Sequence, residues 1–184
     1  DRPVVDEAVM ALTSSSYAYS LPGKQLENWR IDTVNDISSF CLSEDGSYLT
    51  AMDRLGSYHG IDMSLRREVF RVDTGSSVYI SDPVSAGGST VICVSGTVKA
   101  FNPSDGSVLW ETPLKYGLVN SLAVSPDRSL IAAADSYAVQ IMDTSGEPVL
   151  SLPLPGEEEG YITDLIWSPD GKEITVYIKQ TLMT

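Results

Sequence analysis

Histidine and cysteine are nearly absent from this chain, which holds one histidine and two cysteines in 184 residues. A metal centre built from several histidines is therefore excluded, and a serine–histidine–aspartate triad would have to use His59. No Gly-x-Ser-x-Gly segment supplies the sharp turn that exposes a nucleophilic serine in many hydrolases. Cys41 and Cys93 stand among apolar residues, which favours two buried free thiols over a disulfide. We therefore expect no catalytic residues.

Basic residues and long apolar runs are also scarce. Twelve Lys and Arg residues stand against 25 Asp and Glu residues, which gives a net charge of −13. Nucleic-acid binding is not expected, because phosphate contacts need clustered Lys and Arg. No apolar run approaches the roughly 18 residues of a membrane span, so no membrane insertion is expected. The acidity favours a role in solubility, or adaptation to a salt-rich or acid habitat, over an acid-specific function.

Metal-binding and phosphate-binding patterns are missing as well. The run from Glu157 to Glu159 lacks the alternating Asp and Asn ligands of a calcium loop, which favours a solvated acidic loop. Gly87 and Gly88 form an isolated pair and are predicted to make a hairpin turn instead of a phosphate-binding loop. The sequence therefore predicts neither a metal ion nor a cofactor.

Helical periodicity is absent over any useful length, whereas strand-length apolar runs bounded by Gly, Pro, Asp and Ser occur throughout. With 42% hydrophobic residues, the chain is able to bury a core. The sequence therefore predicts an all-β protein.

One short pattern recurs after three apolar segments. Ser43, Ser125 and Ser168 are each followed two residues later by an aspartate. Ser125 follows Ser43 by 82 residues, about twice a step of 41, and Ser168 follows Ser125 by 43. A period of about 40 to 45 residues is typical of β-propeller blades, each a four-stranded antiparallel sheet.

A second marker repeats with the same period. Gly23, Arg66, Gly106 and Gly146 follow one another at steps of 43, 40 and 40 residues, each between two strand-like runs. Glycine supplies the positive φ that a tight hairpin needs. Arg66 breaks the glycine pattern, so its turn is expected to adopt another geometry.

Laid out by this repeat, residues 1–184 form one β-propeller domain with about four blades' worth of strands. Closed rings in the propeller families that these repeats resemble, which are named below, usually have about six to eight blades. We favour the interpretation that the chain is part of a larger propeller. Its first and last strands could instead pair to close a ring, or two chains could complete one. The expected blades are 7–33 (partial), 37–74, 77–114, 119–155 and 162–180 (partial).

Two segments resemble known propeller families. The run Ser168-Pro169-Asp170-Gly171 after a hydrophobic strand resembles WD40 and related repeats, and the segment from Ala100 to Glu111 resembles a quinoprotein (PQQ-like) repeat. No blade ends in Trp-Asp and no Gly-His precedes one, so these are divergent WD40-like repeats. Trp29 and Trp110 fit the quinoprotein tryptophan position, but no residue set suits a quinone cofactor. The resemblance implies a fold that serves many functions.

Function is then expected on the loops at one end of the propeller. Exposed Tyr, Arg and His residues close together are typical of protein-binding hot spots, although they are also ordinary loop residues. We predict a non-catalytic protein-interaction or scaffold module with a protein partner. The candidate binding residues are Arg54, Tyr58, His59, Tyr116, Tyr137 and Tyr161.

Two alternatives stay open. The chain could belong to a propeller enzyme or ligand-binding protein whose site lies on other blades, although convergent ionisable residues are sparse here. It could also be a structural subunit of a surface or multi-protein assembly, because open blade edges invite self-association. The compartment is not determined. Resemblance to acidic bacterial and archaeal propellers favours an exported or cell-surface location.

Overall fold

The computed structural model describes residues 35–75, 81–115, 119–135, 137–153 and 160–180. All the regular elements in these ranges are β-strands, which confirms the all-β prediction. The partial blade expected at 7–33 lies outside the described residues. In the described part of the chain, no helix is long and apolar enough to cross a membrane.

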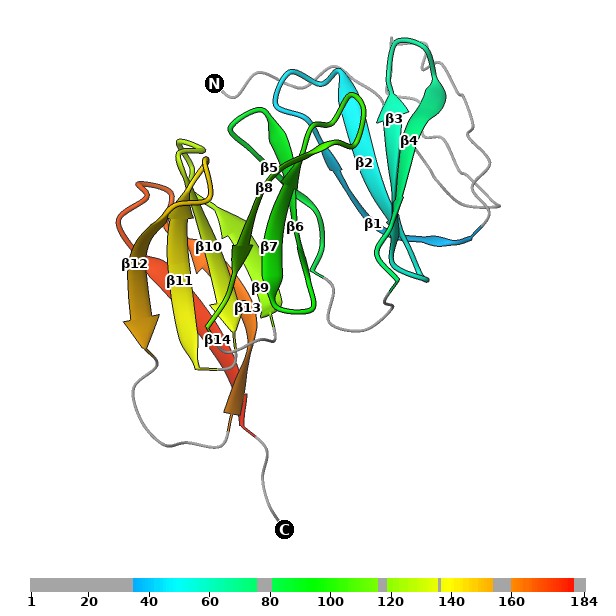
Figure 1. The fold of residues 1–184 in the computed structure, drawn as a ribbon. Coiled ribbons are helices and arrows are strands. Elements are labelled where there is room, and N and C mark those ends of the chain that lie inside the picture. Colours follow the sequence, from blue (N-terminus) through cyan, green and yellow to red (C-terminus); the bar gives the residue numbers. More distant parts are fainter. Residues whose placement is uncertain (1–34, 76–80, 116–118, 136, 154–159, 181–184) are drawn as a thin grey trace, which may run out of the picture.

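The strands form three four-stranded sheets and one two-stranded sheet, all antiparallel with sequential neighbours (Figure 1). The first sheet comprises β1 (Ile37–Leu42), β2 (Tyr48–Asp53), β3 (Ser57–Asp62) and β4 (Arg67–Asp73). The second comprises β5 (Val84–Ala86), β6 (Ser89–Val94), β7 (Thr97–Phe101) and β8 (Val108–Pro113). The third comprises β9 (Val119–Val124), β10 (Leu130–Asp135), β11 (Ala138–Asp143) and β12 (Pro148–Pro153). The fourth comprises β13 (Gly160–Trp167) and β14 (Ile174–Gln180).

The recurring Ser-x-Asp pattern forms the turn between the first two strands of three sheets. The hydroxyl of Ser43 donates to Asp45 at 2.7 Å and accepts the backbone N–H of Tyr48 at 2.9 Å. The same two bonds recur at Ser125 and at Ser168. These bonds satisfy turn groups locally, so each hairpin is fixed by its own sequence.

The turn between the third and fourth strands is also repeated. The side chain of Asp62 accepts the N–H of Ser64 at 2.8 Å, and Asn102 and Asp143 accept equivalent bonds two residues onward. Arg66 has a φ of 54°, close to the 72° of Gly106. The expectation of another geometry at Arg66 is therefore wrong. An arginine occupies the left-handed position that glycine occupies in the second and third sheets, at a cost of about 1–2 kcal/mol.

Apolar clusters join neighbouring sheets. Tyr58 and Ile92 lie in a cluster between the first and second sheets, where the Tyr58 hydroxyl also donates to the carbonyl of Ser81 at 3.0 Å. Ile131 and Cys93 belong to the cluster between the second and third sheets. Ile162 belongs to the cluster between the third and fourth. The described sheets form an open series in chain order and not a closed ring (Figure 1).

An aromatic side chain on the fourth strand of one sheet covers the turn glycine of the next. A Cβ atom on Gly106 would lie 2.5 Å from the ring of Phe70, and one on Gly146 would lie 2.5 Å from the ring of Trp110. The Trp110 indole N–H also donates to the carbonyl of Thr144 at 2.9 Å. A larger residue at either glycine would push the sheets apart, so these contacts set the spacing between sheets.

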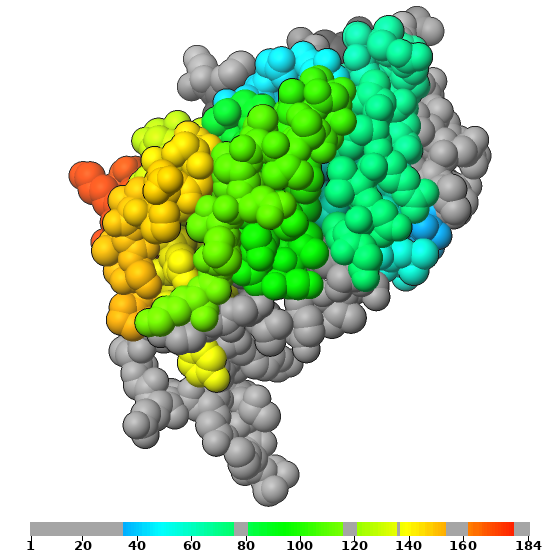
Figure 2. Space-filling model, in the orientation of Figure 1, coloured from blue at the N-terminus to red at the C-terminus, as the bar shows by residue number. Residues whose placement is uncertain are grey.

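Figure 2 shows the three four-stranded sheets side by side, with β12 forming one margin of this surface. On β12, the apolar residues Val149, Leu150 and Leu152 are exposed.

Candidate functional site

The turn face is the surface made by the turns that join β2 to β3, β6 to β7 and β10 to β11, which lie at the same end of the sheets (Figure 1). Two of the six predicted binding residues are exposed on it. Arg54 and its neighbour Leu55 project from the β2–β3 turn. Tyr137, which is 65% exposed, projects from the β10–β11 turn.

Two other predicted residues do not line this surface. Tyr58 and His59 lie inside β3 and are buried, so their placement on an exposed loop is wrong. The β2–β3 turn is short, and β3 begins at Ser57. Tyr116 lies outside the described residues. Tyr161 lies in β13, and its side chain is not among those described.

A buried aspartate holds each of the two turns that carry an exposed candidate binding residue. Asp53 accepts the backbone N–H groups of Leu55 and Ser57 through one carboxylate oxygen, both at 2.9 Å. Asp135 accepts those of Tyr137 and Ala138 in the same way, at 2.8 and 2.7 Å. Both aspartates are almost completely buried. Each exposed side chain therefore stands on a turn that a buried aspartate holds through two backbone N–H groups.

The second oxygen of Asp53 belongs to a polar cluster around His59. It lies 3.3 Å from Nε2 of His59 and accepts a bond from Asn35 at 2.9 Å. Nδ1 of His59 lies 2.9 Å from Oε2 of Glu68. Burial alone would raise the pKa of Asp53, but hydrogen bonds from Asn35, Ser57, His59 and Leu55 hold it below its ordinary value.

This cluster has the composition of a structural network. Both ring nitrogens of His59 already face carboxylates, and Ser57 accepts a bond from Arg71 at 3.1 Å. In the described ranges, no group of three or more His, Cys, Asp and Glu side chains is arranged to hold a metal ion. His59 therefore positions Asp53, and through it the turn that carries Arg54.

The third sheet repeats the turn but not the cluster. In the first sheet, His59 on β3 pairs with Ala51 on β2; in the third sheet, Gln140 on β11 pairs with Ala133 on β10. Gln140 therefore occupies the position in the third sheet that His59 occupies in the first. The second oxygen of Asp135 is buried and has no hydrogen-bond partner within the described residues. The carboxylate therefore supports its own turn alone.

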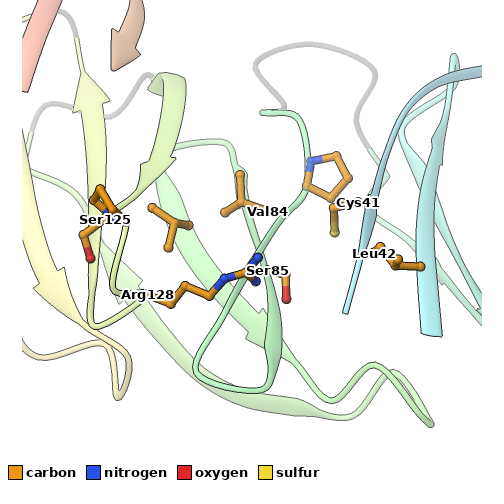
Figure 3. A pocket seen from close by; sticks show the side chains of 9 residues that line it. Cys41, Leu42, Val84, Ser85, Ser125 and Arg128 are labelled. Atoms are coloured by element: carbon orange, nitrogen blue, oxygen red, sulfur yellow. The ribbon is translucent and has the colours of Figure 1, made fainter. Parts of the chain in front are cut away.

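A hollow of about 450 Å³ lies at the opposite end of the sheets, between the first strands of three sheets (Figure 3). Figure 3 shows Cys41 and Leu42 on β1, Val84 and Ser85 on β5, and the side chain of Arg128 extending toward Ser85. The Nη1 atom of Arg128 also lies 3.8 Å from Oε1 of Glu44 in the β1–β2 turn. The lining residues are Cys41, Leu42, Pro83, Val84, Ser85, Val124, Ser125, Pro126 and Arg128.

The two cysteines are free, as expected, although Cys41 is only half-buried. Burial raises the pKa of each thiol to about 12. Each thiol is therefore almost entirely protonated near neutral pH, which disfavours nucleophilic attack by either cysteine.

Comparison with models of known protein families gives no match, and comparison with curated proteins gives none either.

Proposed function

We propose that this chain is a non-catalytic interaction module that binds a partner protein through the turn face. The observation that carries the proposal is the pair of buried aspartates, Asp53 and Asp135, beneath Arg54, Leu55 and Tyr137. Arginine and tyrosine are enriched in protein-binding hot spots. Turns that are already ordered lose little conformational entropy when a partner binds, which favours affinity.

The polar cluster supports the same function. Asn35 and His59 bond to Asp53, and Glu68 bonds to His59; together they support the β2–β3 turn. Within the described residues, these groups are not arranged to hold a metal ion. The arrangement suits a rigid binding surface better than an acid–base site.

The test compares two variants that each carry three alanine substitutions. The full chain and its variant Arg54→Ala/Leu55→Ala/Tyr137→Ala are immobilised and exposed to extract from the source cells, and retained proteins are identified. The control carries Glu44→Ala/Ser129→Ala/Lys172→Ala, at exposed positions on turns at the other end of the sheets. A partner that is retained by the wild type and the control, but lost by the turn-face variant, supports the proposal. A partner lost equally by both variants, or by neither, contradicts it.

We further infer that the four sheets are blades of a β-propeller built from divergent WD40-like or PQQ-like repeats. The repeated hairpin bonds and the sequential face-to-face packing support this inference. A propeller explains why equivalent turns gather at one end, where a single partner can contact several of them.

A second candidate function is that of a structural subunit in an assembly. It is favoured by a specific observation, the exposed apolar residues on β12 and β14 beside the two-stranded fourth sheet. Exposed apolar patches next to an open strand edge are typical of association surfaces.

A further inference from the structure

Arg128 occupies a backbone position that glycine occupies in the two equivalent turns. It is the fourth residue of the Ser-x-Asp turn in the third sheet, where the turns of the first and fourth sheets have Gly46 and Gly171. The φ of Arg128 is 61°, against 74° and 70° at the two glycines. A left-handed φ is unfavourable for a residue with a Cβ atom, so glycine is the less strained choice here. Strained residues of this kind cluster at binding and catalytic sites.

The strained turn directs a guanidinium group into the hollow at the end opposite the turn face (Figure 3). Within the described residues, the ion pair of this group is with Glu44, whose Oε1 lies 3.8 Å from Nη1 of Arg128. That distance is too long for a hydrogen bond. The Arg128 side chain is also 51% exposed. Its N–H groups are therefore available to a ligand that enters the hollow.

A second polar group in the hollow has an unmet hydrogen bond. The hydroxyl of Ser85 is buried and makes no hydrogen bond within the described residues. Figure 3 shows the Arg128 side chain extending toward Ser85, and no hydrogen bond joins the two. A buried hydroxyl without a partner is unfavourable, and its hydrogen can rotate toward an acceptor. Because both groups can donate, a single acceptor between them would satisfy both.

The remaining walls of the hollow are mainly apolar. Leu42, Val84 and Val124 come from the first strands of three consecutive sheets, and two prolines lie beside them. The volume of about 450 Å³ lies within the range of about 300–1,000 Å³ that is typical of small-molecule sites. Apolar walls with a few placed polar groups are also typical of such sites. All the lining residues are described, so these walls do not depend on any other part of the chain.

We propose that this hollow binds a carboxylate group carried on a short apolar body, with Arg128 as the anchor and Ser85 as a second donor. Arginine holds a carboxylate through two parallel N–H···O bonds. Arg128 is the only cationic side chain among the lining residues, and Glu44 stands beside it, so a single negative charge suits the site better than a phosphate dianion. The inference goes beyond the proposed partner binding, because it uses the opposite end of the sheets.

The first test is titration of the full chain with sodium hexanoate, followed by NMR of the backbone amides, in about 150 mM salt to screen the net charge. Saturable shifts are expected at Val84, Ser85 and Arg128 below about 20 mM, since so small a ligand binds in the millimolar range. Hexanamide has the same shape without the charge and is expected to bind about 10- to 100-fold more weakly. Absence of saturable shifts in the hollow overturns the proposal, as does hexylamine that binds as tightly as hexanoate.

The second test separates binding from folding. Arg128→Gly removes the anchor and relieves the strained φ, so it is expected to weaken hexanoate binding about 10- to 100-fold at an unchanged or higher urea midpoint. Ser85→Ala removes an unpaired hydroxyl and is expected to weaken binding about 3- to 10-fold, also without loss of stability. Arg66→Gly is the matched control, because it replaces another left-handed arginine outside the hollow, and it leaves binding unchanged. Hexanoate binding that survives Arg128→Gly overturns the proposal.

The third test examines the competing charge and the source of the carboxylate. Glu44→Gln removes the negative charge beside Arg128 and is expected to tighten hexanoate binding about 3- to 10-fold. Acetyl-Val-Leu with a free carboxyl terminus is compared with hexanoate. Tighter binding of the peptide assigns a peptide terminus as the ligand, and tighter binding of hexanoate assigns a free acid. An amidated peptide that binds as well as the free one overturns the proposal.

Failure of this inference is distinguishable from failure of the proposed function. The turn-face variant Arg54→Ala/Leu55→Ala/Tyr137→Ala is expected to bind hexanoate as the wild type does. Arg128→Gly is expected to retain the partner protein that the turn face captures.

Discussion

Phe70 on β4 lies directly opposite Gly60 on β3, and its ring fills the space that a side chain at position 60 would need. The same ring covers Gly106 of the second sheet. It is therefore held between a glycine of its own sheet and a glycine of the next. Two positions without side chains allow one aromatic ring to connect two sheets.

Substitution Gly60→Ala is expected to lower the free energy of unfolding by about 1–3 kcal/mol, because the new methyl group overlaps a ring with little room to move. Urea denaturation followed by fluorescence measures the change. Phe70→Leu in the Gly60→Ala background is expected to restore part of the loss. Gly88→Ala is the control: nothing lies within 4 Å of its added Cβ, but its φ of +75° costs about 1–2 kcal/mol. Partial rescue of Gly88→Ala by Phe70→Leu would contradict this explanation.

The two buried aspartates predict a difference between equivalent substitutions. Asp53→Asn places an amide group against Asn35 and His59 and removes a charge that they stabilise, so it is expected to cost about 2–3 kcal/mol. Asp135→Asn keeps the oxygen that holds its turn and is expected to cost less than about 1 kcal/mol. Urea midpoints of the two variants check the order. Equal losses would show that the cluster around His59 adds nothing to the turn.

The turn aspartates predict loss of stability in acid. Bonds from the Ser47 N–H and the Ser43 and Ser47 hydroxyls lower the pKa of Asp45 to about 2. The pKa is lower in the folded than in the unfolded chain, so the contribution is present above about pH 4 and is lost as the pH falls toward 2. Urea midpoints across this range measure the loss, and Asp45→Asn is expected to make it shallower. Hydrogen bonds likewise lower the pKa values of Asp62, Asp105, Asp127, Asp143 and Asp170.

The raised thiol pKa values predict slow alkylation of the folded protein. With a pKa of about 12, only about one thiol in 10,000 is a thiolate at pH 8 for either Cys41 or Cys93. Iodoacetamide is therefore expected to modify neither residue in the native state and both in denaturant, as read by mass spectrometry. Because folding raises both pKa values, their contribution to stability is lost as the pH rises from about 9 toward 12. Rapid native modification of Cys41 would contradict the raised pKa of its thiol.

The sequence was most informative where structure is local. The Ser-x-Asp turns were predictable because their bonds join residues at most five apart. Placement of Tyr58 and His59 failed because their burial depends on contacts with the second sheet and with Glu68. One signal was available: Asp53 and Asp135 are 82 residues apart, as Ser43 and Ser125 are. The equal spacing indicates that Asp53 and Asp135 occupy the same position of the repeat, at the start of a short turn. Positions 58 and 59 would then be expected in the strand that follows this turn.

Arg66 was misjudged for a related reason. A left-handed φ favours glycine, but the hydrogen bonds from Ser64 and Leu65 to Asp62 fix the turn strongly enough to hold an arginine there. The partners that fix a backbone conformation can thus lie several residues from the strained position. Residue type at one site is then a poor guide to its geometry.

The strand β5, which lines the hollow at the opposite end, leads into one short hairpin. The second sheet turns from β5 to β6 through Gly87 and Gly88 alone, whereas its neighbours use the longer Ser-x-Asp turn. Arg128 can therefore reach Glu44 across the gap. Grafting the longer turn into the second sheet would put an aspartate between these two charges and fill the space. The length of a single loop thus determines whether this end of the protein is open or sealed, and a change of a few codons is enough to switch it.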